Sequence, residues 1–479
     1  MKIIPQIFSV ILLSLPMAFS ATSESKTAGK PNLVIILIDD FGYECVGANG
    51  GESYKTPVMD QLAATGVRFT ECHAQPLCTP TRVQMMTGIN NRNNYSHFGH
   101  LDPSQTTFGN LLKNAGFATC IAGKWQLDNG PAGIKKFGFD EFALWQLETK
   151  GSRYKAPKLE INGKTYSGEK NEYGPDVVSD FALDFMTRKK DVPFFLYYPM
   201  MLTHSPFDAT PDSPDYLESI SGESEGESGA KKSKSKDGKD VGHFPDMVAY
   251  TDKLIGKLIA KLDELKLRDK TLVLILGDNG TAKGMPSKFQ GREVHGAKGS
   301  PTMWGTRVPC IASWPNHIAS GKVSSDLIDT TDFLPTICEA TSTKVPEELN
   351  IDGRSFLSQL RGEKGNPREC LYVWYNDDGG ANAEFEFAHD GKYKLYTNGK
   401  FYNVEKDDKE KSPLTESQLD ANAKAVRAKL LAELQQHAGP RPEAFSKLGI
   451  SRKNGKGEGE DDSVDASGKK KDKSKNKDK

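Results

Sequence analysis

Two short pairs of polar residues in this chain carry the oxygen atoms that hard metal ions prefer. Asp39-Asp40 directly follows the apolar run 33–38, and Asp278-Asn279 follows the apolar run 272–276 after a single glycine. Together the pairs offer three carboxylates and one amide oxygen, which suit Ca²⁺ or Mg²⁺ better than Zn²⁺, an ion that prefers nitrogen and sulfur. The first pair alone could be a hydrogen-bonded turn, but the two pairs together predict a divalent-cation site.

The sequence Cys78-Thr79-Pro80-Thr81-Arg82 is the second feature that could do chemistry. Its spacing is not that of a metal site, which would need a further cysteine or histidine close by. Arg82 could anchor the start of a helix, take part in the chemistry of this segment, or do both.

Three apolar runs must position these residues. The runs 33–38, 194–198 and 272–276 are continuous rather than alternating, which predicts strands buried on both faces of a mostly parallel sheet covered by helices. The first and third lead into the two polar pairs, and the second leads to Thr203-His204. Functional groups collect outside the carboxyl ends of such strands, so we expect the three polar sets to share one edge.

The chain divides into a large and a small part by its patterns. Helices are predicted at 56–66, 107–116 and 246–265 between the strands, which indicates an α/β domain over 31–365. The segment 366–445 predicts a smaller antiparallel sheet, with strands at 371–375, 393–396 and 400–403. It also predicts a helix that Thr415 opens and Gly439-Pro440 ends. The apolar stripe of this helix is expected to pack on the small sheet.

Both ends of the chain have a composition that differs from the rest. Residues 1–20 are typical of a cleaved secretory signal peptide, so we expect an exported protein, periplasmic or extracellular, without a membrane span after cleavage. An insert at about 219–241 and the tail 451–479 are expected to be disordered. The net charge of -1 gives no indication of a nucleic-acid partner, and the scattered seven cysteines predict no disulfide pair.

The segment 78–82 resembles the Cys-x-Pro-x-Arg signature of the formylglycine-dependent sulfatases, an arylsulfatase-like family of the alkaline phosphatase superfamily. The segment 116–126 is similar to that family's Gly-Tyr-x-Thr-x-x-x-Gly-Lys-Trp-His signature, with Lys124 at the lysine and Gln126 in place of the histidine. The segments 297–300 and 307–309 resemble its Lys-Gly and Arg-Val-Pro sequences, with Lys298 as the second lysine. The two polar pairs also match the family's pattern of metal ligands.

The resemblance implies hydrolysis of sulfate esters on a carbohydrate or aryl substrate. A maturation enzyme would oxidise Cys78 to formylglycine (3-oxoalanine), whose hydrate attacks sulfur, while Arg82 orients it. Lys124, Lys298 and His204 would hold the sulfate and assist the leaving alcohol. The cation, Ca²⁺ or alternatively Mg²⁺, would be bound by Asp39, Asp40, residue 78, Asp278 and Asn279. Glutamine is not a base at neutral pH, so Gln126 predicts a slower or differently served elimination step.

Three alternatives stay open at the level of sequence. The first is a phosphate or phosphonate ester hydrolase of the same superfamily, which would require zinc or manganese. The second is a non-catalytic binder of sulfated glycans, favoured by Gln126 and by Met303-Trp304-Gly305 in place of the family's Glu-Gly-Gly. The third is an exported protein whose cysteine is never matured. Trp145, Trp304 and Trp374 could stack on sugar rings or belong to the core.

Overall fold

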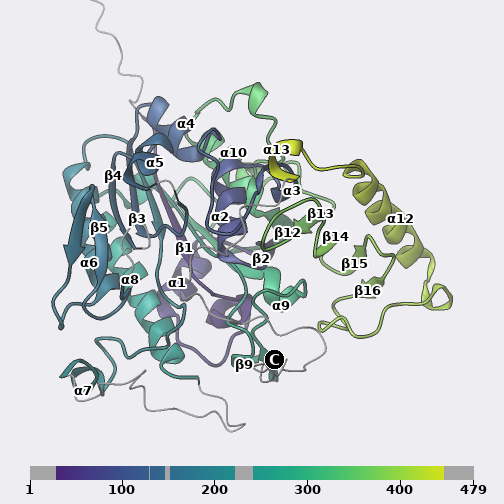
Figure 1. The fold of residues 1–479 in the computed structure, drawn as a ribbon, viewed down its shortest axis with the longest axis horizontal. Helices are drawn as coiled ribbons and strands as arrows, with labels where there is room; N and C mark the ends of the chain where they lie inside the picture. The colour runs from purple at the N-terminus through teal and green to yellow at the C-terminus, as the bar shows by residue number, and fades with distance from the viewer. Residues whose placement is uncertain (1–28, 129, 146–150, 222–240, 447–479) are drawn as a thin grey trace, which may run out of the picture.

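The computed structural model describes residues 29–128, 130–145, 151–221 and 241–446, and in these ranges a ten-stranded sheet forms the centre of the molecule (Figure 1). Its strands are β1 Asn32–Ile38, β2 Val67–His73, β3 Ala118–Lys124, β4 Glu141–Trp145, β5 Lys158–Ile161, β6 Lys164–Ser167, β7 Phe194–Pro199, β8 Thr271–Gly277, β11 Arg307–Ser313 and β12 Lys322–Asp329. They are ordered β12-β2-β11-β8-β1-β7-β3-β4-β5-β6.

The middle of this sheet is parallel and its edges are mixed. The neighbours β8-β1-β7-β3-β4 all run in the same direction. β11 is antiparallel to both of its neighbours, and β5 and β6 form an antiparallel edge. The three predicted apolar runs are the adjacent strands β1, β7 and β8, so the prediction of a large, mostly parallel sheet is confirmed.

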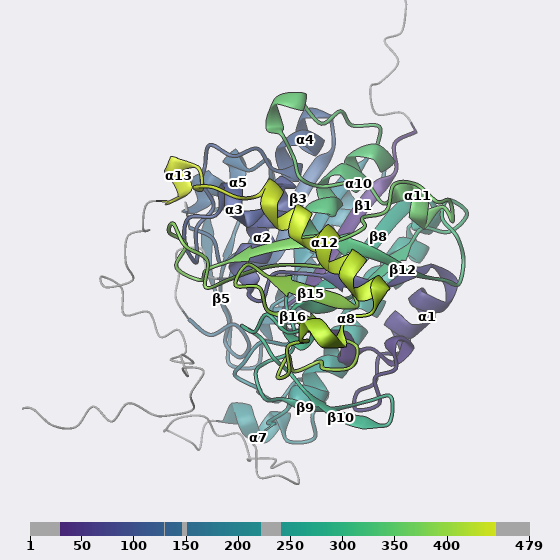
Figure 2. The same ribbon diagram turned by 90° about the vertical axis from the view of Figure 1, so that its right-hand side faces the viewer.

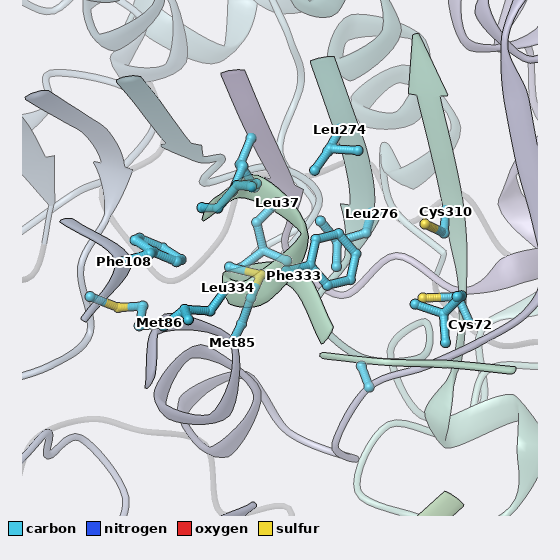
Figure 3. Close-up of a cluster of buried hydrophobic side chains, with 14 of the residues drawn as sticks. Leu37, Cys72, Met85, Met86, Phe108, Leu274, Leu276, Cys310, Phe333 and Leu334 are labelled. Carbon is cyan, nitrogen blue, oxygen red and sulfur yellow. The ribbon is translucent and has the colours of Figure 1, made fainter. Parts of the chain in front are cut away.

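Helices cover both faces of the sheet because its central strands are apolar on both sides. Leu33, Ile35 and Leu37 of β1 belong to one buried cluster, and the alternate residues of the same strand belong to the other. The first cluster is covered by α2 Cys78–Thr87, α4 Phe108–Asn114 and α10 Phe333–Ala340. The second is covered by α1 Pro57–Thr65, α6 Gly174–Arg188 and α8 Phe244–Glu264. Figure 3 shows part of the first cluster, where Leu37 and Leu276 face Met85 and Phe333.

The three helices predicted between the strands are confirmed as α1, α4 and α8, with ends within two residues of the prediction. α4 begins after Thr107, whose hydroxyl accepts from the backbone N–H of Asn110 while the Asn110 side chain accepts in return. Shorter elements complete this part: α3 Asn91–Asn94, α5 Gly130–Lys136, α7 Tyr216–Ser221, α9 Met303–Thr306, α11 Leu357–Leu360, and the hairpin of β9 Pro286–Phe289 with β10 Arg292–His295.

A separate antiparallel sheet of four strands, counted within the described ranges, lies near the C-terminal end. Its strands, in spatial order, are β13 Leu371–Tyr375, β14 Phe385–His389, β15 Tyr393–Tyr396 and β16 Phe401–Asn403. The helix α12 Ala421–Gln436 lies across this sheet (Figure 2), and α13 Glu443–Ser446 follows it. Leu419, Ala423, Leu430 and Leu434 are buried in one cluster with residues of β14 and β15, so the predicted packing of the apolar stripe is confirmed.

Two details of the small sheet and its helix differ from the prediction. β14 was not predicted, and the long helix begins later than expected. Thr415 and Gln418 do form a capping box, but it closes the single 3₁₀ turn Glu416–Gln418. α12 itself is capped by Asp420, whose carboxylate accepts from the backbone N–H of Ala423 at 2.7 Å. Two capping signals follow one another, and the second one starts the helix.

Several sequence predictions concern residues outside the described ranges. The signal peptide 1–20, the tail 451–479 and residues 222–240 of the insert are among them. Residues 219–221 of the predicted insert belong instead to the end of α7. Of the helices in the described part of the chain, none is both long enough and apolar enough to cross a membrane. All seven cysteines lie in the described ranges, and none of them is in a disulfide.

Candidate active site

The ends of the parallel strands are joined to one another by backbone hydrogen bonds. Asp39 follows β1 and donates its N–H to the carbonyl of Leu202 beyond β7 at 3.0 Å, while Thr203 donates back to the carbonyl of Asp39 at 2.8 Å. On the other side of β1, Asp278 donates to the carbonyl of Ile38 at 2.9 Å. The polar residues that follow β1, β7 and β8 are therefore fixed side by side at one sheet edge, as the sequence predicted.

Cys78 is the first residue of α2, and the helix places it against the carboxylates at this edge. Its Sγ and one carboxylate oxygen each from Asp39 and Asp278 all lie within 4.8 Å of one another, and all three side chains are buried. Burial raises the pKa of the Cys78 thiol, although Lys124 acts in the opposite direction. A buried neutral thiol is a poor nucleophile, so the unmodified cysteine is not suited to attack on an ester.

Arg82 lies one turn after Cys78 and joins three elements of the site. Its Nη2 donates to Oδ2 of Asp278 at 2.9 Å, and its Nη1 donates to the carbonyl of Lys124 at 3.0 Å. Lys124, at the end of β3, directs Nζ to both carboxylate oxygens of Asp39 at 2.9 and 2.8 Å. Burial on its own would raise the pKa of Asp39, but Lys124, His204 and Arg82 hold it well below its usual range.

Lys298 and His204 meet at the second carboxylate of the site. Lys298 Nζ donates to Oδ2 of Asp40 at 2.9 Å and lies 3.3 Å from Nε2 of His204, which is itself 3.9 Å from that carboxylate oxygen. Nδ1 of His204 lies 2.8 Å from the carbonyl of Ser205, so it carries the proton and leaves Nε2 as an acceptor. Burial is the main reason that the pKa of His204 falls to about 4, and the ring is neutral near neutral pH.

The oxygen ligands expected for a cation are close together and partly unsatisfied. Asn279 donates through Nδ2 to Oδ1 of Asp40 at 2.9 Å, and its own Oδ1 is buried without a hydrogen-bond partner among the described residues. Burial and the neighbouring Asp39 raise the pKa of Asp278, so a positive ion beside these groups would favour their ionised forms. This donor set of carboxylate and amide oxygens fits a hard divalent cation.

Gln126 differs from the other predicted site residues in its hydrogen bonding. It follows the end of β3 by two residues and has a positive φ of 52°. Its Oε1 is buried with no hydrogen-bond partner in the described part of the chain. Among the described residues, no hydrogen bond joins Gln126 to the cluster of Asp39, Lys124 and Cys78, so its place in the sequence is what relates it to them.

Arg153 belongs to the site and was missed by the sequence analysis. Its Nη1 lies 3.8 Å from Oδ2 of Asp39, and its guanidinium stacks 3.8 Å from the ring of Trp145. That Nη1 is buried and makes no hydrogen bond to any described residue, although the side chain is 12% exposed. A single arginine in a polar segment carries no signal in sequence, and it reaches the site only because β4 brings Trp145 beside β3.

Charge at this edge favours an anion. Four basic side chains face three carboxylates here, even before a cation is added. The basic residues are Arg82, Lys124, Lys298 and Arg153, and the acidic ones are Asp39, Asp40 and Asp278. The side chains of Trp145, Trp304 and Trp374 are all buried. For most of their surface the structure therefore supports packing in the core, the second of the two roles considered above. The arrangement can thus bind a small anionic group beside residue 78 and stabilise negative charge that develops on it.

Comparisons with known proteins agree with this arrangement. The chain matches the family description "Sulfatase" over residues 31–343 and the description "N-sulphoglucosamine sulphohydrolase, C-terminal" over residues 303–439. N-acetylgalactosamine-6-sulfatase of Mus musculus is 31% identical over 372 residues, which cover 70% of this chain and 67% of the relative. Arylsulfatase A of Homo sapiens is 29% identical over 406 residues, which cover 77% and 75%.

Solved structures share the fold. The crystal structure of Ps i-CgsB in complex with k-i-k-neocarrahexaose has a TM-score of 0.71 and 24% identity, and the match covers 88% of this chain and 96% of that one. A structure in complex with its substrate D-glucosamine-2-N,6-O-disulfate has a TM-score of 0.66 and 21% identity, with coverage of 85% and 98%. The chain therefore belongs to the sulfatase family, whose members are sulfuric ester hydrolases of the alkaline phosphatase superfamily.

Proposed function

We propose that this sulfatase removes sulfate from a carbohydrate by means of a formylglycine made from Cys78 and a divalent cation, Ca²⁺ in preference to Mg²⁺. The observation that carries the proposal is the convergence at Cys78. Its Sγ shares a 4.8 Å cluster with Asp39 and Asp278, while Arg82 and Lys124 are hydrogen-bonded to those same two carboxylates. A cysteine held in this way is set among charges that serve an anionic substrate rather than among partners of a structural thiol.

The proposed cation site consists of Asp39, Asp40, residue 78, Asp278 and Asn279. The unsatisfied Oδ1 of Asn279 supports it, since a buried amide oxygen without a partner is costly unless an ion or a water binds it. Once formed and hydrated, formylglycine supplies a hydroxyl that can attack sulfur, and the cation supplies positive charge next to it.

Each basic side chain has a proposed task. Arg82 holds the start of α2 and Asp278 in register, so that residue 78 faces the substrate. Lys124 and Lys298 bind oxygens of the sulfate and share their charge with Asp39 and Asp40. Their ammonium groups are fixed before substrate arrives, which lowers the cost of stabilising charge in the transition state.

His204 and Lys298 are proposed to serve the leaving alcohol together. The neutral Nε2 of His204 accepts from Lys298 at 3.3 Å, so a proton can reach the leaving oxygen from Lys298 directly or through the imidazole. Burial alone would lower the pKa of Lys298, but Asp40 and its other acidic neighbours raise it above its usual range, and the residue enters the reaction fully charged.

The substrate is proposed to be a sulfated sugar. The solved structures named above contain a neocarrahexaose and a glucosamine disulfate, and one curated relative is named for N-acetylgalactosamine-6-sulfate. Arg153 adds a cation beyond those that hold the two carboxylates, and we propose that it binds an anionic group of the substrate.

The remaining proposals concern the export, the maturation and the domains of the protein. We propose that the protein is exported by the signal peptide 1–20, to the periplasm or outside the cell, and that a formylglycine-generating enzyme is its maturation partner. The proposed units are the catalytic domain 31–365, with its insert at about 219–241, and the C-terminal subdomain 366–445, followed by the tail 451–479.

The test of the proposal is the mass of the tryptic peptide 69–82 from protein made in a host with a maturation system. We expect a peptide that is lighter by the exchange of the thiol for an aldehyde and that reacts with a hydrazide. Cys78→Ala is the matched control, since alanine fits in the buried space of the cysteine and cannot be converted. An unmodified thiol under these conditions would favour the sulfated-glycan binder, for which Gln126 is the supporting residue.

A further inference from the structure

A second group of metal-binding side chains lies outside the catalytic cluster. His97 and His100 are in the loop after α3, and Asp128 is in the loop after β3. One ligand atom from each of the three residues lies within 4.8 Å of the other two. None of the three residues has a role in the proposed hydrolysis, and their proximity calls for an explanation of its own.

The backbone around this group fixes the three residues next to one another. Asp128 donates its N–H to the carbonyl of Gly99 at 2.8 Å. Gly99 in turn donates to Oγ1 of Thr79 at 3.3 Å, which joins the loop to the start of α2. The histidine loop is thus held between the helix that carries residue 78 and the segment that carries Gln126.

The side chains are arranged for a ligand rather than for a hydrophobic contact. The rings of His97 and His100 stack with centroids 4.7 Å apart at an angle of 8°. Nδ1 of His100 lies 2.6 Å from Oδ2 of Asp128. All three residues are partly exposed, so an ion can reach them from solvent.

The charges near the rings also suit a cation. An imidazole coordinates a metal ion through an unprotonated ring nitrogen, and each of the two stacked rings can offer one. Asp128 and Asp378 both attract positive charge at His97, so two carboxylates lie close to it. Two imidazole nitrogens with an adjacent carboxylate are the ligands of many zinc sites, whereas Ca²⁺ prefers an all-oxygen set.

We propose that His97, His100 and Asp128 form a second metal site, which binds Zn²⁺ or a similar transition-metal ion and leaves a coordination position for water or for Asp378. Metal–ligand distances near 2 Å require the three ligand atoms to draw together by about an ångström, which rotation of exposed side chains permits. The ion would tie the loop after α3 to the loop after β3 beside the catalytic site. The site does not depend on formylglycine, so it is present in unmatured protein as well.

The experiment uses the full chain without a histidine tag, stripped with a chelator and then saturated with Ca²⁺ to fill the hard-ligand site. Titration with Zn²⁺ alone is followed by calorimetry, and titration with Co²⁺ by its visible absorption. We expect one equivalent of Zn²⁺ to bind in the presence of Ca²⁺. His97→Ala and His100→Ala should each weaken this binding by about tenfold or more, because each removes a direct ligand.

Three further variants make the assignment specific. Asp128→Asn changes a side chain that is 49% exposed, so the fold should be unaffected. This variant should also weaken Zn²⁺ binding. His317→Ala, which removes a histidine that stacks on Trp314, and Cys370→Ser, which removes a half-buried thiol, should leave it unchanged. The proposal is overturned if no Zn²⁺ binds to the Ca²⁺-saturated protein. It is equally overturned if binding survives the histidine variants.

Discussion

Arg82 and Asp278 form an ion pair of 2.9 Å in which both side chains are almost completely buried. The pair joins α2, one turn after residue 78, to the end of β8, and a second hydrogen bond from Arg82 reaches the carbonyl of Lys124 at 3.0 Å. One guanidinium therefore fixes the positions of residue 78, a proposed metal ligand and a proposed sulfate ligand relative to one another. The planar fork of arginine reaches the two partners with two separate nitrogens, whereas lysine has a single nitrogen to serve both.

Arg82→Lys is expected to impair both folding stability and activity. A buried carboxylate that loses its partner costs about 3–5 kcal/mol in the free energy of unfolding, and lysine replaces only part of the interaction. Urea unfolding and the kcat/KM for a sulfate ester measure the two effects. Arg188→Lys is the control, since its pair with Glu141 is 41% exposed on the arginine side and is worth about 1 kcal/mol or less. Equal effects of the two substitutions would contradict the central position given to Arg82.

Gln126→His tests whether the site lacks a base. The positive φ of 52° at this position is tolerated by histidine better than by most residues, so the backbone should not change. An imidazole can accept the proton that glutamine cannot, and we expect kcat to rise by about tenfold or more in matured protein. Gln126→Asn, which keeps an amide, is the control and should not raise kcat. A turnover that is unaffected or lower in Gln126→His would mean that another group already serves this step.

Much of the fold and of the site could be predicted because their signals are local. The apolar runs of β1, β7 and β8 are each followed at once by their polar residues, and parallel strands bring such residues to the same edge. Cys78 and Arg82 are one helical turn apart, so their relation also follows from sequence. The lysines required the family resemblance, because nothing in their spacing relates Lys124 to Lys298.

The rest depended on contacts between distant segments. Arg153 reaches Asp39 only through the pairing of β4 with β3 and the stacking of its guanidinium on Trp145. β14 follows a segment rich in glycine, asparagine and aspartate, and its place is set by its two neighbouring strands. The predicted start of α12 was wrong because Thr415 and Asp420 are both good N-caps, and packing against the small sheet decides between them.

Arg153→Met is expected to weaken substrate binding more than the chemical step. Methionine keeps much of the apolar contact with Trp145 but removes the charge that faces the site. Because Arg153 lies beyond the residues that act on the sulfur, we expect KM for a sulfated disaccharide to rise by about tenfold with a smaller change in kcat. Arg292→Met is the matched control, since Arg292 also faces a tryptophan ring, Trp304, but is 54% exposed. A fall in kcat at constant KM would assign Arg153 to the reaction itself.

Removal of the divalent cation should abolish turnover and lower stability. Asp39, Asp40 and Asp278 are buried together, and burial with the neighbouring Asp39 raises the pKa of Asp278 despite the basic side chains nearby. The ion adds attraction to these carboxylates beyond what the lysines and arginines supply. We expect chelator-treated protein to unfold at a lower temperature and to recover both properties on addition of Ca²⁺. Asn279→Ala, which removes the unsatisfied Oδ1, should raise the Ca²⁺ concentration needed for recovery. Full activity in the thoroughly stripped enzyme would contradict the proposed cation site.

The buried pair His73 and His389 should make the protein sensitive to acid. The rings lie 4.4 Å apart between β2 and β14, that is, between the large sheet and the small one. Burial is the main cause that lowers the pKa of both histidines well below 6.5. At His73 the positive charges of Arg307 and Lys394 lower the pKa further. Glu71 also faces this ring, with a carboxylate oxygen 3.2 Å from its Nε2.

The sign of the pH effect follows from these lowered pKa values. Below pH 6.5 the unfolded chain binds protons that the folded protein does not, so the free energy of unfolding falls by up to about 1.4 kcal/mol per pH unit for each histidine. Urea unfolding at pH 7 and pH 5 measures this loss. His389→Phe keeps a ring against His73 and should reduce the loss, whereas His317→Phe, at the ring that stacks on Trp314, should leave it unchanged. If His389→Phe loses as much stability between the two pH values as the wild-type protein does, the pair is not the acid-sensitive contact between the two sheets.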